Sequence, residues 1–278
     1  MARYKGREAI YQIAEEFRQR CLGQDHSSTS LLWPERSIWT KQNLETLKAA
    51  FIDNPNEGSG SFYEKWEIQL ARESADIHRL AADLIAFYYL FPSNLNSSTK
   101  LSHLKEVIAW KLSEHDPPDY DAVSAAFESG GLGSTGQHYL TSIHAILGYF
   151  IDIFIRLKQH SGEGLLDLYS ESEVRANADD VAEKYPTNAT LTRNVLMHLL
   201  FPDQHERTVS TSQRHMIRGA FSSIAELPRD LDRALLKIRN EFAKVHGPGF
   251  DFYDEGIHHL WDEEADAPEH EKIIANPS

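Results

Sequence analysis

Residues 86–94, AFYYLFPSN, and residues 196–204, LMHLLFPDQ, both place the phrase Leu-Phe-Pro at the end of an apolar run. Proline lacks a backbone N–H and clashes with a preceding helical turn, so each phrase predicts the end of a buried helix. A Ser/Thr cluster and a basic amphipathic segment follow in each copy, as SSTKLSHLKEVIAW and STSQRHMIRGAF. The repetition predicts two related helical lobes, and their corresponding loops are the first place to look for a binding surface.

The remaining sequence predicts an all-α, multi-helix bundle. Apolar residues recur at three- and four-residue steps, the spacing of an amphipathic helix; they are Ile10, Ile13, Ala14, Phe17 and Cys21, and then Leu44, Leu47 and Phe51. Pro/Gly clusters stand where helices should end, and no alternating β-branched run is flanked by hairpin turns. The predicted domains are a first helical lobe at 1–128, a second at 129–250, with a central apolar helix and basic helices, and an acidic tail at 251–278.

The most apolar segment, residues 139–157, raises the question of a membrane span. His144, Asp152 and Arg156 interrupt it. The remaining apolar stretch is shorter than the roughly 20 residues that a bilayer requires. We therefore expect a buried central helix and no membrane contact.

Charge and cysteine content limit the functional classes. The formal net charge of −14 argues against general nucleic-acid binding, which depends on cations that displace counterions from phosphates. The distribution is uneven, because residues 190–250 carry more cations than carboxylates and residues 251–278 are strongly acidic. One cysteine permits no internal disulfide, and the start MARYKGREAI lacks the apolar stretch of a signal peptide. We expect a cytoplasmic protein.

No residue set predicts catalysis, a metal site or a cofactor. There is no GxSxG elbow, and Cys21 lies on an apolar helix face, where a thiol is inert. His258 and Asp262, with His259 nearby, have only a weak metal-ligand spacing, and a solvated acidic tail is the simpler interpretation. The glycine-rich residues 129–136 lack the lysine of a Walker A loop. They predict either a flexible or tightly turned connector or an anion site at the start of the following helix.

Basic residues beside the two Leu-Phe-Pro loops are the candidate nucleic-acid contacts. In the second copy, Ser/Thr helix caps lie between Arg207 and the pair Arg214 and Arg218, an arrangement that can hold a phosphate. In the first copy, a similar cluster precedes Lys100 and Lys105, so two basic helix starts can contact a polyanion at two points. The alternative is that both are ordinary capped surface helices whose cations pair with acidic neighbours.

A family resemblance is carried by the same segments. The stretch NVLMHLLFPDQHERTVSTSQRHMIRGAF, followed by LDRALLKIRNEF and FDFYDEGIHHLW, resembles the helical N-terminal region of bacterial McrB-like AAA+ proteins, the motor subunits of modification-dependent restriction systems. FYEKWEIQLA, LAADLIAFYYLFPSN and GGLGSTG are similar to upstream signatures of that region. The resemblance spans roughly residues 60–262. It implies a bacterial anti-phage defence protein that selects a target, often modified DNA, for a motor and nuclease.

No Walker A, Walker B or nuclease motif is found in these residues. The resemblance therefore implies either the N-terminal portion of a longer motor protein or a stand-alone relative that lends recognition to a separate AAA+ motor. The first functional hypothesis is a non-enzymatic recognition or adaptor module that contacts nucleic acid. The second is a scaffold that docks a motor, nuclease or phage protein through Trp261, without nucleic-acid contact. The third, an enzyme with a site around residues 130–138, has no nucleophile with an orienting partner.

Overall fold

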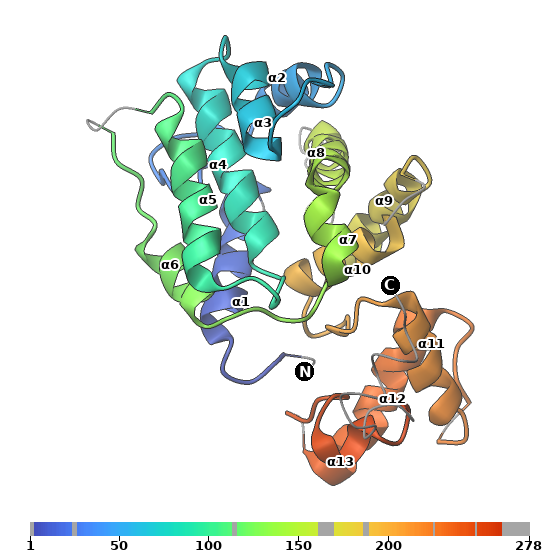
Figure 1. The fold of residues 1–278 in the computed structure, drawn as a ribbon. Coiled ribbons are helices and arrows are strands. Elements are labelled where there is room, and N and C mark those ends of the chain that lie inside the picture. Colours follow the sequence, from blue (N-terminus) through green and yellow to red (C-terminus); the bar gives the residue numbers. More distant parts are fainter. Residues whose placement is uncertain are drawn as a thin grey trace.

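The computed structural model describes residues 3–23, 27–112, 116–160, 170–185, 189–224, 226–247 and 249–262. Within these ranges all regular secondary structure is helical apart from one isolated bridge between Pro92 and Gly133, which confirms the predicted all-α fold (Figure 1). The helices are α1 (Glu8–Glu16), continued by the π-helical η1 (Phe17–Cys21), α2 (Lys41–Phe51), α3 (Phe62–Leu70), α4 (Ala75–Tyr89), α5 (Ser97–Ala109), α6 (Asp121–Glu128), α7 (Gly136–Thr141), α8 (Ile143–His160), α9 (Glu171–Ala182), α10 (Ala189–Leu200), α11 (Thr211–Ala220), α12 (Leu231–His246) and α13 (Glu255–His258).

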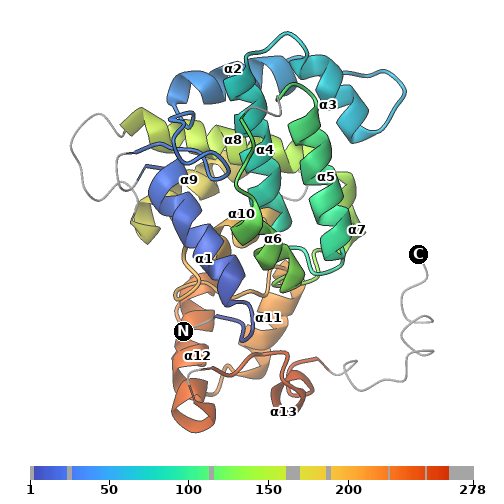
Figure 2. The same cartoon turned by 90° about the vertical axis from the view of Figure 1, so that its left-hand side faces the viewer.

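The predicted amphipathic faces form the core. All of the periodic apolar residues of α1, η1 and α2 are buried, as the spacing predicts. Helix α4 is the most enclosed element, with thirteen of its fifteen residues buried, and it packs against α5 and α2. Figure 2 shows α4 in the middle of the bundle, with α5 alongside it. The low exposure of α4 explains the unbroken apolar run at residues 84–89, because a helix that is covered on all sides has no solvent-facing side.

The central apolar segment is divided between α7 and α8 and lies inside the bundle. Phe150 and Phe154 on α8 stack on each other, and Phe154 also contacts Phe17 of η1 and Phe87 of α4. Among the described residues, no helix combines the length and apolarity that a bilayer crossing needs. The predicted buried central helix is therefore confirmed, although it begins at Ile143 and not within α7.

The two Leu-Phe-Pro copies have the same local structure. Each ends a buried helix, α4 or α10, and each is followed by a helix with a side-chain N-cap, Asn96 for α5 and Ser210 for α11. The two copies differ in the packing of the helix that follows. Helix α5 packs back along α4, whereas α11 packs on α12. The repeat is thus a helix-end motif used twice.

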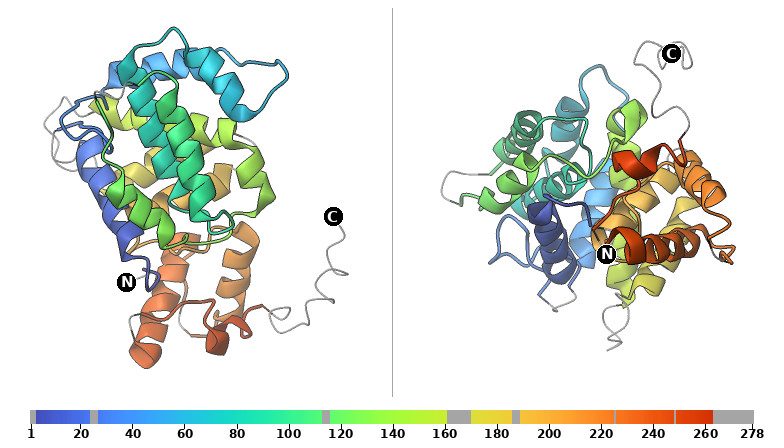
Figure 3. Two further views of the ribbon diagram at one scale, coloured as in Figure 1. Left: turned by 60° about the vertical axis from the view of Figure 1, so that its left-hand side comes forward. Right: turned by 90° about the horizontal axis from the view of Figure 1, so that it is seen from below.

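The hydrophobic core divides at a different place from the predicted boundary at 128. One cluster of buried residues extends from Ile10 to Val209 and includes both predicted lobes. A second, small cluster is formed by Ile217, Phe221, Leu235, Ile238, Phe250, Phe252, Ile257 and Trp261. We call residues 3–209 the body and residues 210–262 the C-terminal lobe; Figure 3 shows the lobe below the body. Residues 251–262, expected to be tail, contribute to the lobe core, and residues 263–278 lie outside the described residues.

Candidate functional site

The loop between α10 and α11, residues 201–210, lies at the junction of body and lobe. Phe201 and Val209 belong to the body cluster. Glu206 and Arg207, between them, are paired with the lobe residues Arg239 and Asp251. The second Leu-Phe-Pro copy begins this loop, so the segment that the sequence singled out lies at the junction.

Arg214 does not face solvent, which corrects its assignment as a nucleic-acid contact. Its guanidinium is ion-paired with Asp232 and donates to the carbonyl oxygen of Thr208 at 3.1 Å. The residue is 2% exposed. Burial lowers the pKa of Arg214. A phosphate could reach this group only by displacing a buried carboxylate.

Arg207 is largely buried and fully engaged. Its Nε and Nη2 donate to the two carboxylate oxygens of Asp251 at 2.5 and 2.7 Å, and its Nη1 donates to the carbonyl oxygen of Leu132 at 2.9 Å. The guanidinium carbon lies 4.3 Å from the ring centroid of Tyr4 and 4.4 Å from that of Tyr253. Planar stacking with a bidentate carboxylate is the environment that suits arginine best. Arg207 therefore organises the junction, and its charge is neutralised by Asp251.

The other predicted cations are dispersed. Lys100 is fully buried, and its Nζ donates to the carbonyl oxygen of Gly130 at 2.9 Å, so it too is withdrawn as a phosphate contact. Burial, with a smaller effect of nearby Arg7, lowers the pKa of Lys100 to about 8. Lys105 is exposed on α5, with its Nζ over the ring of Tyr120. Arg218, on α11 of the lobe, donates to the carbonyl oxygens of residues 228 and 229.

Trp261 is not an exposed anchor. It is 4% exposed, belongs to the lobe core, and its Nε1 donates to the carbonyl oxygen of Phe252 at 2.7 Å. Its carboxylate-rich sequence context suggested a solvated tail, whereas the indole closes the end of the lobe. The prediction that Trp261 is an exposed anchor for a partner is therefore wrong.

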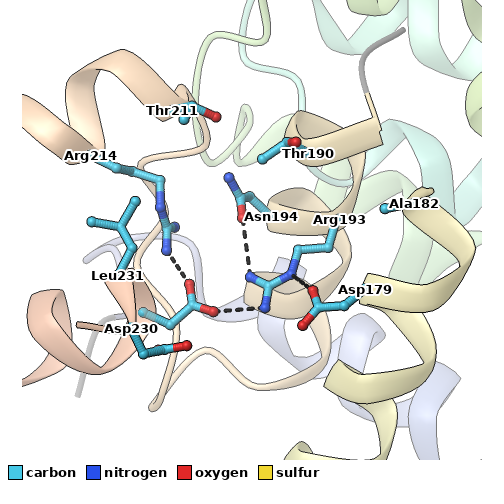
Figure 4. A pocket seen from close by; sticks show the side chains of 10 residues that line it. Asp179, Ala182, Thr190, Arg193, Asn194, Thr211, Arg214, Asp230 and Leu231 are labelled. Carbon is cyan, nitrogen blue, oxygen red and sulfur yellow. Dashed lines mark hydrogen bonds and ion pairs between the residues drawn. The ribbon is translucent and has the colours of Figure 1, made fainter. Parts of the chain in front are cut away.

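A cavity of about 290 Å³ lies between α9, α10, α11 and the start of α12. We call it the ion-pair cavity. Figure 4 shows Arg193 and Arg214 extending into the cavity from opposite sides, with Asp179 bound to Arg193. Both arginines are ion-paired with Asp232. Burial acts to raise the pKa of Asp232, but nearby His205, the hydrogen bond from Arg193 and the charge of Arg214 outweigh it and hold that pKa well below its ordinary value. With three carboxylates and two arginines in its lining, this cavity is already neutralised.

A second cavity, of about 490 Å³, has the opposite character. We call it the glycine-loop cavity. It is lined by Tyr4, Arg7, Ser93, Gly131, Leu132, Gly133, Ser134, Arg207, Val209, Ser210, Ser212, Gln213 and Tyr253. No carboxylate is among them, although the chain has a net charge of −14. Both Leu-Phe-Pro loops and the glycine-rich loop therefore meet at one polar cavity.

The glycine-rich loop is packed tightly against the first Leu-Phe-Pro loop. Gly133 forms a bridge with Pro92, and the amide of Leu132 donates to the carbonyl oxygen of Phe91 at 2.8 Å. A Cβ on Gly131 would lie 2.4 Å from the carbonyl oxygen of Pro92, which is closer than side-chain carbons approach. Of the two predicted alternatives for this stretch, the tight connector is observed, and it also forms one wall of the cavity.

Arg7 is the cation that the sequence did not single out. Its Nε donates to the carbonyl oxygen of Gly131 at 3.1 Å, and its guanidinium lies over the ring of Tyr4. Among the described residues, no carboxylate lies within ion-pair distance of Arg7. Arg7 and buried Lys100 thus bring two positive charges to the same glycine loop, one on the cavity side and one behind it.

The first turn of α11 faces the same cavity. Ser210 caps the helix, and the first intrahelical bond runs from the amide of Arg214 to the carbonyl oxygen of Ser210. The amide of Gln213 donates to the Ser210 hydroxyl at 3.5 Å, and the amides of Thr211 and Ser212 have no intrahelical acceptor, so this helix start is a favourable place for an anion. The hydroxyl groups of Ser212 and Ser93 are exposed beside it.

A hydrogen-bonded chain fixes the N-terminal segment that carries Tyr4 and Arg7. The amide of Tyr4 donates to the Tyr11 hydroxyl at 2.8 Å, and that hydroxyl lies 3.1 Å from Nε2 of His198. Nδ1 of His198 is 2.7 Å from the carbonyl oxygen of His205, which can only accept, so Nδ1 carries the proton. Burial lowers the pKa of His198 to about 3, which keeps its imidazole neutral. The segment is therefore tied to α10 and to the junction loop.

Within the described residues there is no group of three or more His, Cys, Asp and Glu side chains that could hold a metal ion. His258 pairs with Asp262. The carboxylates that follow them in the sequence, Glu263 and Asp266, lie outside the described residues. The side chain of His138, at the end of the glycine-rich stretch, also lies outside them.

Comparison of the chain with protein-family models, with curated proteins and with solved structures finds no match.

Proposed function

We propose that this chain is a non-enzymatic recognition module and that its ligand carries a phosphate group, which binds in the glycine-loop cavity. The observation that carries the proposal is the charge of the lining: two arginines and no carboxylate, in a protein with a net charge of −14. Because Asp251 neutralises Arg207, the net attraction comes from Arg7, supported by Lys100 behind the loop and by the first turn of α11.

Size and chemistry limit the ligand. Ligand cavities range from about 300 to 1,000 Å³, and at about 490 Å³ this one suits a mononucleotide-sized group. Arg7, Ser93 and Ser212 can donate to phosphate oxygens, which accept several hydrogen bonds at once. A groove for a long nucleic-acid backbone is disfavoured, because Lys100 and Arg214 are buried and Arg207 is paired with Asp251. The remaining two predicted cations, Lys105 and Arg218, lie on separate parts of the fold.

In the setting implied by the McrB-like resemblance, such a module would sense a nucleotide or a nucleic-acid phosphate and present it, or report it, to a AAA+ motor or nuclease in the bacterial cytoplasm. Arg207, Arg214 and Lys100 are not part of the proposed contact. Contact with modified DNA would then be restricted to one nucleotide or strand end.

Titration calorimetry with inorganic pyrophosphate and with a mononucleotide tests the proposal. The unaltered chain should bind, and Arg7→Gln should weaken binding by roughly tenfold or more, the loss expected for a charge-assisted contact. Arg72→Gln is the matched control, since Arg72 lines another cavity, of about 460 Å³, between the loop that follows α2 and the C-terminal end of α3. Equal affinity in the two variants would refute the assignment of the site.

A second function, docking of a protein partner, is favoured by one observation. Of the five large apolar side chains that are exposed among the described residues, four lie in the lobe, and these are Met216, Ile224, Val245 and Leu260. Val245→Lys with Leu260→Lys should weaken co-purification with a AAA+ motor or nuclease partner. Ile68→Lys, at the exposed apolar residue of the body, should not. Equal loss in both would argue against the lobe as the docking surface.

A further inference from the structure

The body and the C-terminal lobe have separate hydrophobic cores. The body cluster ends at Val209, and the lobe cluster begins at Ile217. Helices α11 and α12 pack on each other, whereas the helices of the body pack among themselves. One covalent connection, at residue 210, joins the two parts. Little of what holds the lobe in place is therefore apolar packing between helices.

Ion pairs cross the junction instead. The shortest N–O distance is 2.6–2.7 Å in Arg193–Asp232, Arg175–Asp230 and Arg233–Glu171. Two further pairs, Arg239–Glu206 and Arg207–Asp251, are bidentate, as is Arg175–Asp230. Asp232 is the centre of this set, because it binds Arg193 of the body and Arg214 of the lobe and lies 3.6 Å from Nδ1 of His205. The ion-pair cavity lies at the same place (Figure 4).

Such a junction differs energetically from an apolar core. The attraction between buried charges is largely offset by the water that they lose, so an intact pair contributes little net stability, while one partner left alone in the interior is strongly unfavourable. Separation returns both charges to water. A junction of this kind fixes the geometry of the two parts, but separating them as units requires little free energy. Opening the aromatic core around Phe154 in the body requires much more.

We propose that the C-terminal lobe is a hinged element that docks on the body through these ion pairs, and that the glycine-loop cavity exists only in the docked state. Tyr253, Ser212 and Gln213 come from the lobe, whereas Arg7 and the glycine loop come from the body. A ligand that contacts both parts holds them together, and docking in turn raises the affinity for that ligand, because the linkage is reciprocal. Only the ligand dependence rests on the proposed function; the hinge itself does not.

Thiol labelling of the full chain measures the opening. The native Cys21 is buried in the body core and reports its unfolding. Thr208→Cys places a second thiol at the junction, where Thr208 is 1% exposed and its carbonyl oxygen accepts from Arg214. Under native conditions the thiol at 208 should react faster than Cys21 by about tenfold or more, because sub-global opening requires less free energy than unfolding.

Two variants on α12 distinguish an effect on the junction from a general effect on the lobe. Asp232→Asn removes a carboxylate that crosses the junction, whereas Glu241→Gln removes one that pairs with Lys244 within the lobe. Asp232→Asn should accelerate labelling at residue 208 by roughly tenfold or more, with Cys21 little changed. Glu241→Gln should leave both rates unchanged. The same comparison can be made by hydrogen exchange of α12 against α4, which needs no introduced cysteine.

Inorganic pyrophosphate separates the two proposals. If the site and the hinge are both correct, pyrophosphate slows labelling at residue 208. If labelling responds to Asp232→Asn but not to pyrophosphate, the hinge stands and the proposed ligand site falls. The hinge would be overturned if body and lobe open together. In that case residue 208 and Cys21 would be labelled at the same rate in every variant, or the amides of α12 and α4 would exchange at the same rate.

Discussion

Arg207 and Asp251 form a bidentate ion pair, with Nε–Oδ2 and Nη2–Oδ1 distances of 2.5 and 2.7 Å, across the junction between body and lobe. A lysine at 207 would keep the charge but lose the planar fork and the stacking between Tyr4 and Tyr253. Arg207→Lys should therefore lower the free energy of unfolding by about 2 kcal/mol or more, measured by urea denaturation.

Arg3→Lys is the control for that prediction. Arg3 is also bidentate with a carboxylate, that of Asp203, but both side chains are more than two-fifths exposed. Exposed pairs contribute roughly 0–1 kcal/mol, so this variant should unfold almost as the parent does. If Arg3→Lys and Arg207→Lys lower the free energy of unfolding equally, burial and stacking do not determine how much the Arg207 pair contributes to stability.

Gly131→Ala tests the packing of the glycine loop. An added Cβ would lie 2.4 Å from the carbonyl oxygen of Pro92, so the loop must shift; we expect a loss of about 1–3 kcal/mol and weaker pyrophosphate binding. Gly219→Ala meets open space on α11 and should stabilise the fold by up to about 1 kcal/mol. A lower Tm for Gly131→Ala and a higher Tm for Gly219→Ala would support this account. An unchanged Tm for Gly131→Ala would contradict it.

His198 makes stability depend on pH. Its pKa is about 3 in the fold, because it is buried, and about 6.5 in an unfolded chain. The unfolded state therefore binds the proton first, and the contribution of His198 is complete above about pH 6.5 and declines as the pH falls toward 3. Between pH 6.5 and 5 the loss should be about 2 kcal/mol, measured by denaturant unfolding.

His198→Gln should show a shallower decline over that interval, although it is less stable at neutral pH because the bond to the carbonyl oxygen of His205 is altered. The exposed His259 serves as the control, and His259→Gln should follow the parent curve. Parallel pH profiles for all three proteins would show that His198 is not the group responsible.

The fold was predictable because its signals are local. Amphipathic spacing depends on neighbouring turns of one helix, so Ile10 to Cys21 and Leu44 to Phe51 could be placed on buried faces from the sequence. Proline after Leu-Phe marked the ends of α4 and α10 for the same reason. The number of cores could not be predicted, because the packing of α5 on α4 and of α11 on α12 is decided by residues far apart in the chain.

The sequence singled out the loops that meet at the glycine-loop cavity, but not the side chains that line it. Both Leu-Phe-Pro loops and the glycine-rich loop do line one cavity. The cations were misassigned because their carboxylate partners are remote: Asp251 is 44 residues from Arg207, and Asp232 is 18 from Arg214. Arg7 was missed because a single arginine before the first helix has no local pattern, and only the fold places it beside Gly131.

The most direct test of the central claim is a crystal structure of the full chain with pyrophosphate bound. The proposal predicts phosphate density in the glycine-loop cavity, within hydrogen-bonding distance of the Arg7 guanidinium and of the first turn of α11. Pyrophosphate ordered in the ion-pair cavity or between α2 and α3, with the glycine-loop cavity holding none, would contradict it.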